Sequence, residues 1–184
     1  MHEISLHILD LVENSTGAGA DKVKLTVEED SRQDELRIRI EDNGRGMDAK
    51  MVSEVRDPFV TSRTTRKVGL GLPLMDMTTN MCDGCLKIES APGVGTLVEA
   101  SYRLSHIDRP PLGNMAATLK TILVMNPELH FIYYHRVDER SFLLDSLEIR
   151  AALGDLPLTR PEVLDWLDGY LKVNLSILYG GSEE

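Results

Sequence analysis

A carboxylate stands beside two glycines at the end of a strongly alternating stretch of the chain. Ile38 and Ile40 precede Asp42, and this period of two predicts a strand that delivers Asp42 to the rim of a sheet. Gly44 and Gly46 follow, and a residue without Cβ lets a flat ligand lie against the backbone. Asp42 can accept a hydrogen bond from a ring amine such as the exocyclic nitrogen of adenine. The pattern predicts a purine pocket, with a plain Asp-Asn-Gly turn as the alternative.

A second set of polar residues lies near the N-terminus. Apolar residues recur there at helical spacing and predict an amphipathic helix over residues 3–16. Residues three or four positions apart share one side of a helix, and the polar side here holds Glu3, His7, Asp10 and Asn14. This side is expected to face the polar site. His7 is expected to be solvated, with a hydrogen bond to Asp10 or to a phosphate as the alternative.

A third element combines glycines with the start of a helix. Gly69 and Gly71 precede Pro73, and the apolar spacing beyond them predicts a helix that begins near this proline. Free N–H groups and the positive end of the helix dipole are available to a phosphate at such a place. The preceding loop, 57–68, has a local excess of basic residues that includes Arg63, Arg66 and Lys67. We expect this loop to meet phosphate, and a solvated surface loop is the alternative.

The remaining pattern predicts an α+β fold. Strands are expected at 22–29, 35–41, 86–90, 96–104, 130–137 and 141–144, and further helices at 48–56, 114–125, 146–153 and 161–178. Arg109-Pro110-Pro111 breaks the pattern and marks a boundary. We therefore expect a ligand-binding domain at 1–108 and a small α+β module at 112–180 that serves docking or dimerisation. Trp166 and the pair Tyr133 and Tyr134 are expected to anchor this module.

Composition limits the classes of function. The 184 residues include 20 basic and 30 acidic side chains, a net charge of −10, which argues against nucleic acid or an anionic membrane as the main partner. The sequence shows no signal segment and no apolar run of about 18 residues, so a cytoplasmic location is expected. Cys82 and Cys85 cannot form a disulfide framework. A packing or turn role is favoured for them over a thiol pair or half of a zinc site.

Three ordered motifs resemble a known superfamily. The segments 13–23, 42–47 and 69–72 resemble the asparagine box and the two glycine boxes of the GHKL superfamily, which unites DNA gyrase, heat-shock chaperone ATPases, histidine kinases and mismatch-repair ATPases. In addition, 58–63 resembles the phenylalanine box of the ATP lid, and 93–96 the closing Gly-Thr strand. The resemblance covers about residues 1–105. It implies a Bergerat-type α/β sandwich, with a mixed or antiparallel sheet and helices on one face.

The resemblance also implies ATP and Mg²⁺ as cofactors. Asn14 would be the Mg²⁺ ligand, Asp42 would bind the adenine amine, and Thr96 would support it. The glycines of the second box would present N–H groups to the phosphates, with basic residues of the loop closing over them. The implied cofactor-binding set is Asn14, Asp42, Gly44, Gly46, Met47, Thr61, Arg63, Arg66, Lys67, Gly69, Leu70, Gly71, Leu72 and Thr96.

The expected chemistry depends on Asp10. In hydrolysing relatives a glutamate stands one helical turn before the metal asparagine, and Asp10 at the matching position is shorter by one methylene. This implies slow hydrolysis, or a residue that only solvates the helix or helps to bind metal water. The leading expectation is a histidine-kinase-like regulatory protein that acts on a protein partner by phosphoryl transfer or by an ATP-dependent change. A slow ATP hydrolase acting as a dimer clamp, and a nucleotide sensor without turnover, are the alternatives.

Overall fold

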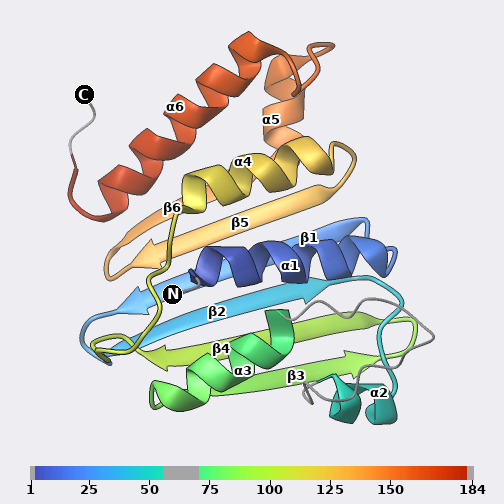
Figure 1. Ribbon diagram of the computed structural model, residues 1–184. Coiled ribbons are helices and arrows are strands. Elements are labelled where there is room, and N and C mark those ends of the chain that lie inside the picture. The colour runs from blue at the N-terminus through green and yellow to red at the C-terminus, as the bar shows by residue number, and fades with distance from the viewer. Residues whose placement is uncertain (1–2, 56–70, 182–184) are drawn as a thin grey trace.

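The protein folds around one six-stranded mixed sheet with the strand order β3-β4-β2-β1-β5-β6 (Figure 1). The computed structural model describes residues 3–55 and 71–181. Neighbouring strands run antiparallel except β1 and β5, which are parallel. The strands are β1 (Lys22–Asp30), β2 (Glu35–Asp42), β3 (Cys85–Ala91), β4 (Gly95–Arg103), β5 (His130–Val137) and β6 (Arg140–Asp145). The expected α+β class is confirmed.

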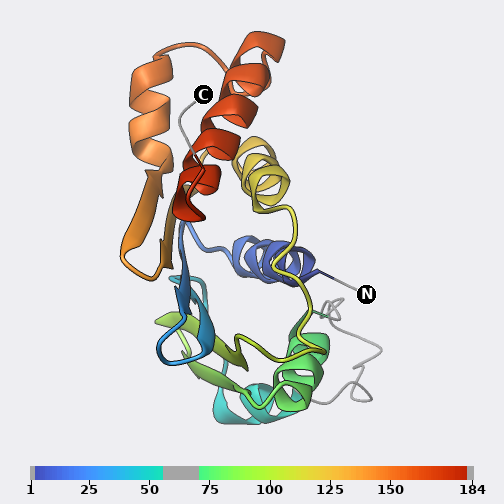
Figure 2. The ribbon, with the colours of Figure 1, turned by 90° about the vertical axis from the view of Figure 1, so that its left-hand side faces the viewer.

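The helices lie where the sequence places them. They are α1 (Ile4–Gly17), α2 (Ala49–Glu54), α3 (Gly71–Met81), α4 (Met115–Met125), α5 (Ser146–Leu153) and α6 (Pro161–Leu178). Figure 2 shows α1, α3 and α4 on one side of the sheet. Side chains alternate between the two faces of the sheet accordingly. On the helix-covered face, Val23, Leu25 and Val27 of β1 are fully buried. On the opposite face, Arg39 of β2 makes ion pairs with Glu41 and Glu99.

Helix α1 is covered on more sides than its sequence indicates. Its apolar residues are buried as expected, but His7 is only 3% exposed, so the expectation of a solvated histidine is wrong. The reason is the contact of α1 with both α3 and α4 in addition to the sheet. The segment before α4 also closes over the helix start, since Pro111 and Leu112 accept hydrogen bonds from the N–H groups of Ile4 and Ser5 at 3.0 and 2.9 Å.

The C-terminal segment extends the first sheet. β5 pairs with β1 from Lys22 opposite His130 to Glu29 opposite Val137, and β6 adds the outer edge. The segment 112–180 thus continues the sheet formed by the first 105 residues, and its expected role in docking or dimerisation stays a prediction. Tyr133 is fully buried and anchors this end of the core, whereas Trp166 is 46% exposed and does not.

The two cysteines differ in environment. Cys82 is 1% exposed, in line with the expected packing role, and burial raises the pKa of its thiol. Cys85 is exposed on β3. Within residues 3–55 and 71–181, no three histidine, cysteine, aspartate or glutamate side chains gather as they would around a metal ion. In the same part of the chain, no helix has the length and apolar character needed to cross a membrane.

Candidate functional site

The carboxylate of Asp42 is held by one donor on each oxygen. The Ser15 hydroxyl of α1 donates to Oδ2 over 2.7 Å, and the Gly44 N–H donates to Oδ1 over 2.9 Å. Ser15 also lies 3.1 Å from the Leu11 carbonyl, but the shorter contact to a charged acceptor is the stronger one. Thr96 of β4 stands directly opposite Asp42 in the sheet register. The structure therefore connects the end of β2 to α1 on one side and to β4 on the other.

Helix α1 brings Asp10 and Asn14 to the same region. Asn14 directly precedes Ser15, and both Asn14 and Asp10 are partly buried. Neither side chain has a hydrogen-bond partner within the described ranges, which leaves their oxygen atoms available. A Cβ built on Gly71 would lie 2.9 Å from the Asp10 Cβ and 3.4 Å from its Oδ2, so the start of α3 touches Asp10 directly. Helix α1 thus meets the start of α3 at Asp10 and the end of β2 at Ser15, the residue that directly follows Asn14.

The loop after Asp42 is hydrogen-bonded to the segment that joins α1 to β1. The side-chain amide oxygen of Asn43, Oδ1, accepts hydrogen bonds from the Asp21 and Lys22 N–H groups at 3.1 and 3.0 Å. The Arg45 N–H donates to the Ala18 carbonyl over 3.1 Å. These bonds tie the loop to the turn between α1 and β1.

The packing of the protein itself requires glycine at position 46 and leaves little room for a side chain at position 44. Gly46 has φ +67°, and a Cβ there would lie 1.9 Å from the Ala91 carbonyl oxygen. A Cβ on Gly44 would lie 3.1 Å from the Ala18 Cβ. The expected contribution of Gly44 and Gly46 to ligand binding is thus accompanied by a structural reason for glycine at both positions.

Ser90 on β3 connects the loop to Thr96. Its hydroxyl accepts a hydrogen bond from the Met47 N–H over 2.8 Å. It lies 2.9 Å from the Thr96 hydroxyl and 2.9 Å from the Gly95 carbonyl. Met47 and Thr96, both expected at the site, are therefore joined through a residue that was not expected there.

Sequence reasoning missed Ser15, Asn43 and Ser90 as supporting residues. Short polar side chains next to turns are common, so their type alone gives no signal. The predicted hairpin offered one signal for Ser90, because a turn over 91–95 places it opposite Thr96, as the register shows. No comparable pattern indicates that Ser15 reaches Asp42.

Part of the expected site falls outside the described residues. This holds for the segment 58–63 and for Thr61, Arg63, Arg66, Lys67, Gly69 and Leu70. Of the second glycine box, Gly71 and Leu72 are described, and both are buried at the start of α3, with Pro73 in its first turn as expected. Leu72, at 6% exposure, is part of the hydrophobic core.

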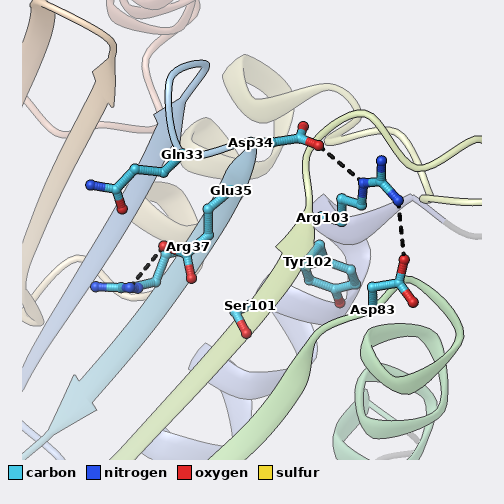
Figure 3. A pocket seen from close by; sticks show the side chains of 8 residues that line it. All are labelled: Gln33, Asp34, Glu35, Arg37, Asp83, Ser101, Tyr102 and Arg103. Carbon is cyan, nitrogen blue, oxygen red and sulfur yellow. Dashed lines mark hydrogen bonds and ion pairs between the residues drawn. The ribbon is translucent and has the colours of Figure 1, made fainter.

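A separate depression lies at the opposite end of β2 (Figure 3). It measures about 560 Å³ and is lined by Gln33, Asp34, Glu35, Arg37, Asp83, Ser101, Tyr102 and Arg103. Seven residues of strand separate Glu35 from Asp42, about 23 Å. The Arg37 and Arg103 cations are already paired, at 2.8 Å to Glu35 and 3.0 Å to Asp34. Hydrogen bonds from Ser105 and Arg103 hold the pKa of Asp34 below its usual value. The depression is thus distinct from the site around Asp42.

Comparison with known proteins agrees with this geometry. Residues 3–106 match the family described as histidine kinase-, DNA gyrase B-, and HSP90-like ATPase. The sensor protein kinase FleS of Pseudomonas aeruginosa is 38% identical over 89 residues, which cover 48% of this chain and 22% of that protein. The non-motile and phage-resistance protein of Caulobacter vibrioides is 32% identical over 97 residues, which cover 50% of this chain and 12% of that protein. The chain thus spans less than a quarter of the length of these relatives.

A solved structure shares the fold over nearly the whole chain. It is the N-terminal domain of a DNA repair protein, with a TM-score of 0.53 and 15% identity, and the match covers 98% of this chain and 58% of that one. At this identity the likeness shows the fold alone. The family match, in contrast, spans the helix, strand end and glycine loop that form the candidate site. Since it covers residues 3–106 of 184, the chain belongs to the histidine kinase-, DNA gyrase B- and HSP90-like ATPase family.

Proposed function

We propose that the chain binds Mg-ATP between α1, the end of β2 and the start of α3, and controls a protein partner as a histidine-kinase-like regulatory protein. Control is exerted by phosphoryl transfer to the partner or by an ATP-dependent change of surface. The observation that carries the proposal is the 2.7 Å hydrogen bond from Ser15 to Asp42. It fixes the Asp42 carboxylate against Ser15, which directly follows Asn14 in α1, and the Asn14 oxygen has no partner in the described part of the chain. Family membership supports ATP as the ligand.

Each residue has a role that its surroundings allow. Asp42 accepts a hydrogen bond from the adenine amine, because each carboxylate oxygen has a free lone pair in addition to the one that its single donor uses. The Thr96 hydroxyl supports the adenine beside Asp42. The amide oxygen of Asn14 is a hard donor of the kind that Mg²⁺ accepts. When bound, the ion offsets the charge of the phosphates. Gly71 offers its N–H at the start of α3, and Gly69, Leu70, Thr61, Arg63, Arg66 and Lys67 complete the phosphate side in this proposal.

The test compares two nucleotides that differ at one ring position. Inosine triphosphate carries a carbonyl where ATP carries the exocyclic amine, so the Asp42 carboxylate would face an acceptor instead of a donor. A buried polar group left without its partner costs about 1–3 kcal/mol. Calorimetric titration should therefore show Mg-ATP binding about tenfold or more tighter than Mg-inosine triphosphate. Equal affinities would contradict the assigned pocket.

Asp10 favours a second candidate, a slow ATP hydrolase that acts as a dimer clamp. A Cβ built on Gly71 would lie 3.4 Å from the Asp10 Oδ2, so this carboxylate lies near the proposed phosphate position, and it is shorter than a glutamate. If the chain hydrolyses ATP, Asp10→Asn should abolish ADP release while ATP still binds. If wild-type release never exceeds background and ATP binds, the chain is a sensor without turnover. Transfer of labelled phosphate onto a protein partner would establish the kinase role.

The net charge of the chain indicates the kind of partner on which this activity acts. With a net charge of −10, the partner is a protein rather than nucleic acid or an anionic membrane. A cytoplasmic location is part of the same proposal. A pull-down of the chain with and without Mg-ATP, probed for nucleic acid as well as protein, tests this choice of partner.

A further inference from the structure

Helix α6 has two apolar sides, of which one is buried and the other is only partly covered. Val163, Leu167 and Leu171 are at most 5% exposed, on a helix that packs against α4 and β6. A second row follows at helical spacing and consists of Trp166, Tyr170, Val173 and Ile177. In this row Trp166 is 46% exposed and Val173 is 37% exposed. We call these four residues the outer row.

The outer row is fixed to the core by ring contacts. Trp166 stacks on Tyr170 with ring centroids 5.3 Å apart and planes 15° apart. Tyr170 meets Phe142 of β6 edge to face at 6.0 Å, and Phe142 meets the buried Tyr133 at 6.1 Å. The exposed indole is therefore held in one orientation, as a residue in a preformed contact surface should be. Helix α6 forms the end of the molecule farthest from β3 (Figure 1).

Gly169 lies beside the outer row, near the middle of α6, and no packing contact within residues 3–55 and 71–181 requires a glycine there. A Cβ built there would meet no atom within 4 Å. Glycine in a helix interior is less stable than alanine, so its presence at an open position has a cost that no internal contact explains. A residue without a side chain at this point lets the backbone of another helix approach closely. The position is thus suited to a helical partner.

The charges beside the outer row favour a second copy of this helix as that partner. Asp165 is exposed and has no ion pair within residues 3–55 and 71–181. Lys172, two turns later, shares Asp168 with Lys120, at 2.5 and 2.8 Å. This side of α6 therefore carries an acid without a partner at one end and an extra base at the other. A second copy of α6 running in the opposite direction would bring each acid beside a base.

We propose that the chain forms a homodimer by antiparallel pairing of α6 with the same helix of a second copy, centred on Gly169. Trp166 then packs against the partner subunit's Val173, and Asp165 pairs with the partner subunit's Lys172. By symmetry each contact occurs twice. The pairing buries the outer row, and it lies on the C-terminal part of the sheet rather than at the nucleotide site.

Sedimentation velocity over a concentration series tests this proposal on the full chain. Trp166 is the only tryptophan, so its emission should shift to shorter wavelength over the same concentration range in which the dimer forms. Asp165→Lys and Lys172→Glu should each raise the dissociation constant at least about tenfold. The double variant exchanges the two charges and should restore the dimer. A wild-type chain that stays monomeric throughout would overturn the proposal, and so would a dimer whose tryptophan emission does not change.

A further variant separates dimer loss from loss of folding. Gly169→Gln puts a good helix former with a long side chain at the open position. The midpoint of thermal unfolding of the monomer should rise, while the dimer should be lost. Gly17→Gln is the matched control, since Gly17 is also a helical glycine with open space around it but lies at the end of α1 rather than in α6. It should leave the dimer intact. If Gly169→Gln dimerises like the wild type, the helix pairing is wrong.

Discussion

Ser15 and Asp42, 27 residues apart in the chain, are joined by a 2.7 Å hydrogen bond that fixes the carboxylate on β2 from a helix. A bond to a charged acceptor contributes about 1.5–3 kcal/mol. Ser15→Ala removes it and lets the carboxylate turn away from the position in which we propose that it meets the adenine amine. The affinity for Mg-ATP should fall about tenfold in calorimetric titration.

Thr16 provides the control for this substitution. Its hydroxyl donates to the Glu13 carbonyl over 3.0 Å on the exposed side of α1 and does not reach Asp42. Thr16→Ala should therefore leave the affinity for Mg-ATP unchanged. An equal loss in both variants would mean that α1 itself is disturbed, and that Ser15 has no special role in orienting Asp42.

Asp42→Asn should weaken ATP binding strongly, because an amide can present a donor to the adenine amine in place of an acceptor. The same amide can donate to the carbonyl of inosine triphosphate, so the preference between the two nucleotides should shrink or reverse. Titrations of both nucleotides measure this. Glu41→Gln, one residue earlier and paired with Arg39 on the other face of the sheet, should have no effect. Unchanged ATP affinity in Asp42→Asn would remove Asp42 from the site.

Two loop glycines should differ in their tolerance of alanine. Gly46 and Gly93 both have positive φ, +67° and +74°. Alanine at Gly93 meets no atom within 4 Å and costs only the strained backbone, about 1–2 kcal/mol. Alanine at Gly46 would in addition meet the Ala91 carbonyl oxygen at 1.9 Å, so its loss in free energy of unfolding should exceed that of Gly93→Ala by about 1–3 kcal/mol, the cost of overpacking. Urea unfolding measures both values, and similar losses would contradict the assigned packing.

A buried polar chain connects α6 to the sheet and should make stability depend on pH. The Tyr133 hydroxyl lies 2.7 Å from His135 Nδ1, and His135 Nε2 lies 3.1 Å from Glu29. The Tyr179 hydroxyl at the end of α6 also donates to Glu29. Burial alone would raise the pKa of Glu29, but the hydrogen bonds from His135 and Tyr179 lower it below its usual value. The folded protein thus binds a proton at Glu29 less readily than the unfolded chain.

The sign of the effect follows from this lowered pKa. The stabilisation is fully present above the usual glutamate value of about 4.3 and is lost as the pH falls through the lower value of the folded state. Tyr179→Phe removes one donor, so the free energy of unfolding should be lower at pH 7 and should fall less between pH 6 and 3. Urea unfolding across this range measures the slope. A slope equal to that of the wild type would show that Tyr179 does not affect the proton affinity of Glu29.

Local pattern predicts the elements of this fold but not how they assemble. The helix at 161–178 and the hairpins follow from spacing, since period and turn chemistry are local properties. The parallel pairing of β1 with β5 has no such signal. About 100 residues separate the two strands, and any strand with alternating apolar residues could form the same backbone hydrogen bonds with β1. For the same reason His7 was expected in solvent, although two helices that lie far from it in sequence cover α1.

In the candidate site, too, some residues can be predicted from the sequence and others cannot. Motif order indicates Asn14, Asp42 and Gly71, and the structure places them around one helix. The supporting hydroxyls of Ser15 and Ser90 depend on side-chain directions in three dimensions, which spacing does not determine. Trp166 shows the opposite error, because a large aromatic residue was expected to anchor a core and instead lies on the surface beside Gly169.

The pairing of β1 with β5 also affects how the chain emerges from the ribosome. At about 5–20 residues per second, some 5–20 seconds of translation separate the release of β1 from that of β5. Throughout this interval one margin of the nascent sheet offers unpaired N–H and C=O groups to any neighbouring polypeptide. The order of synthesis therefore creates a window for aggregation that closes only when the last third of the protein arrives.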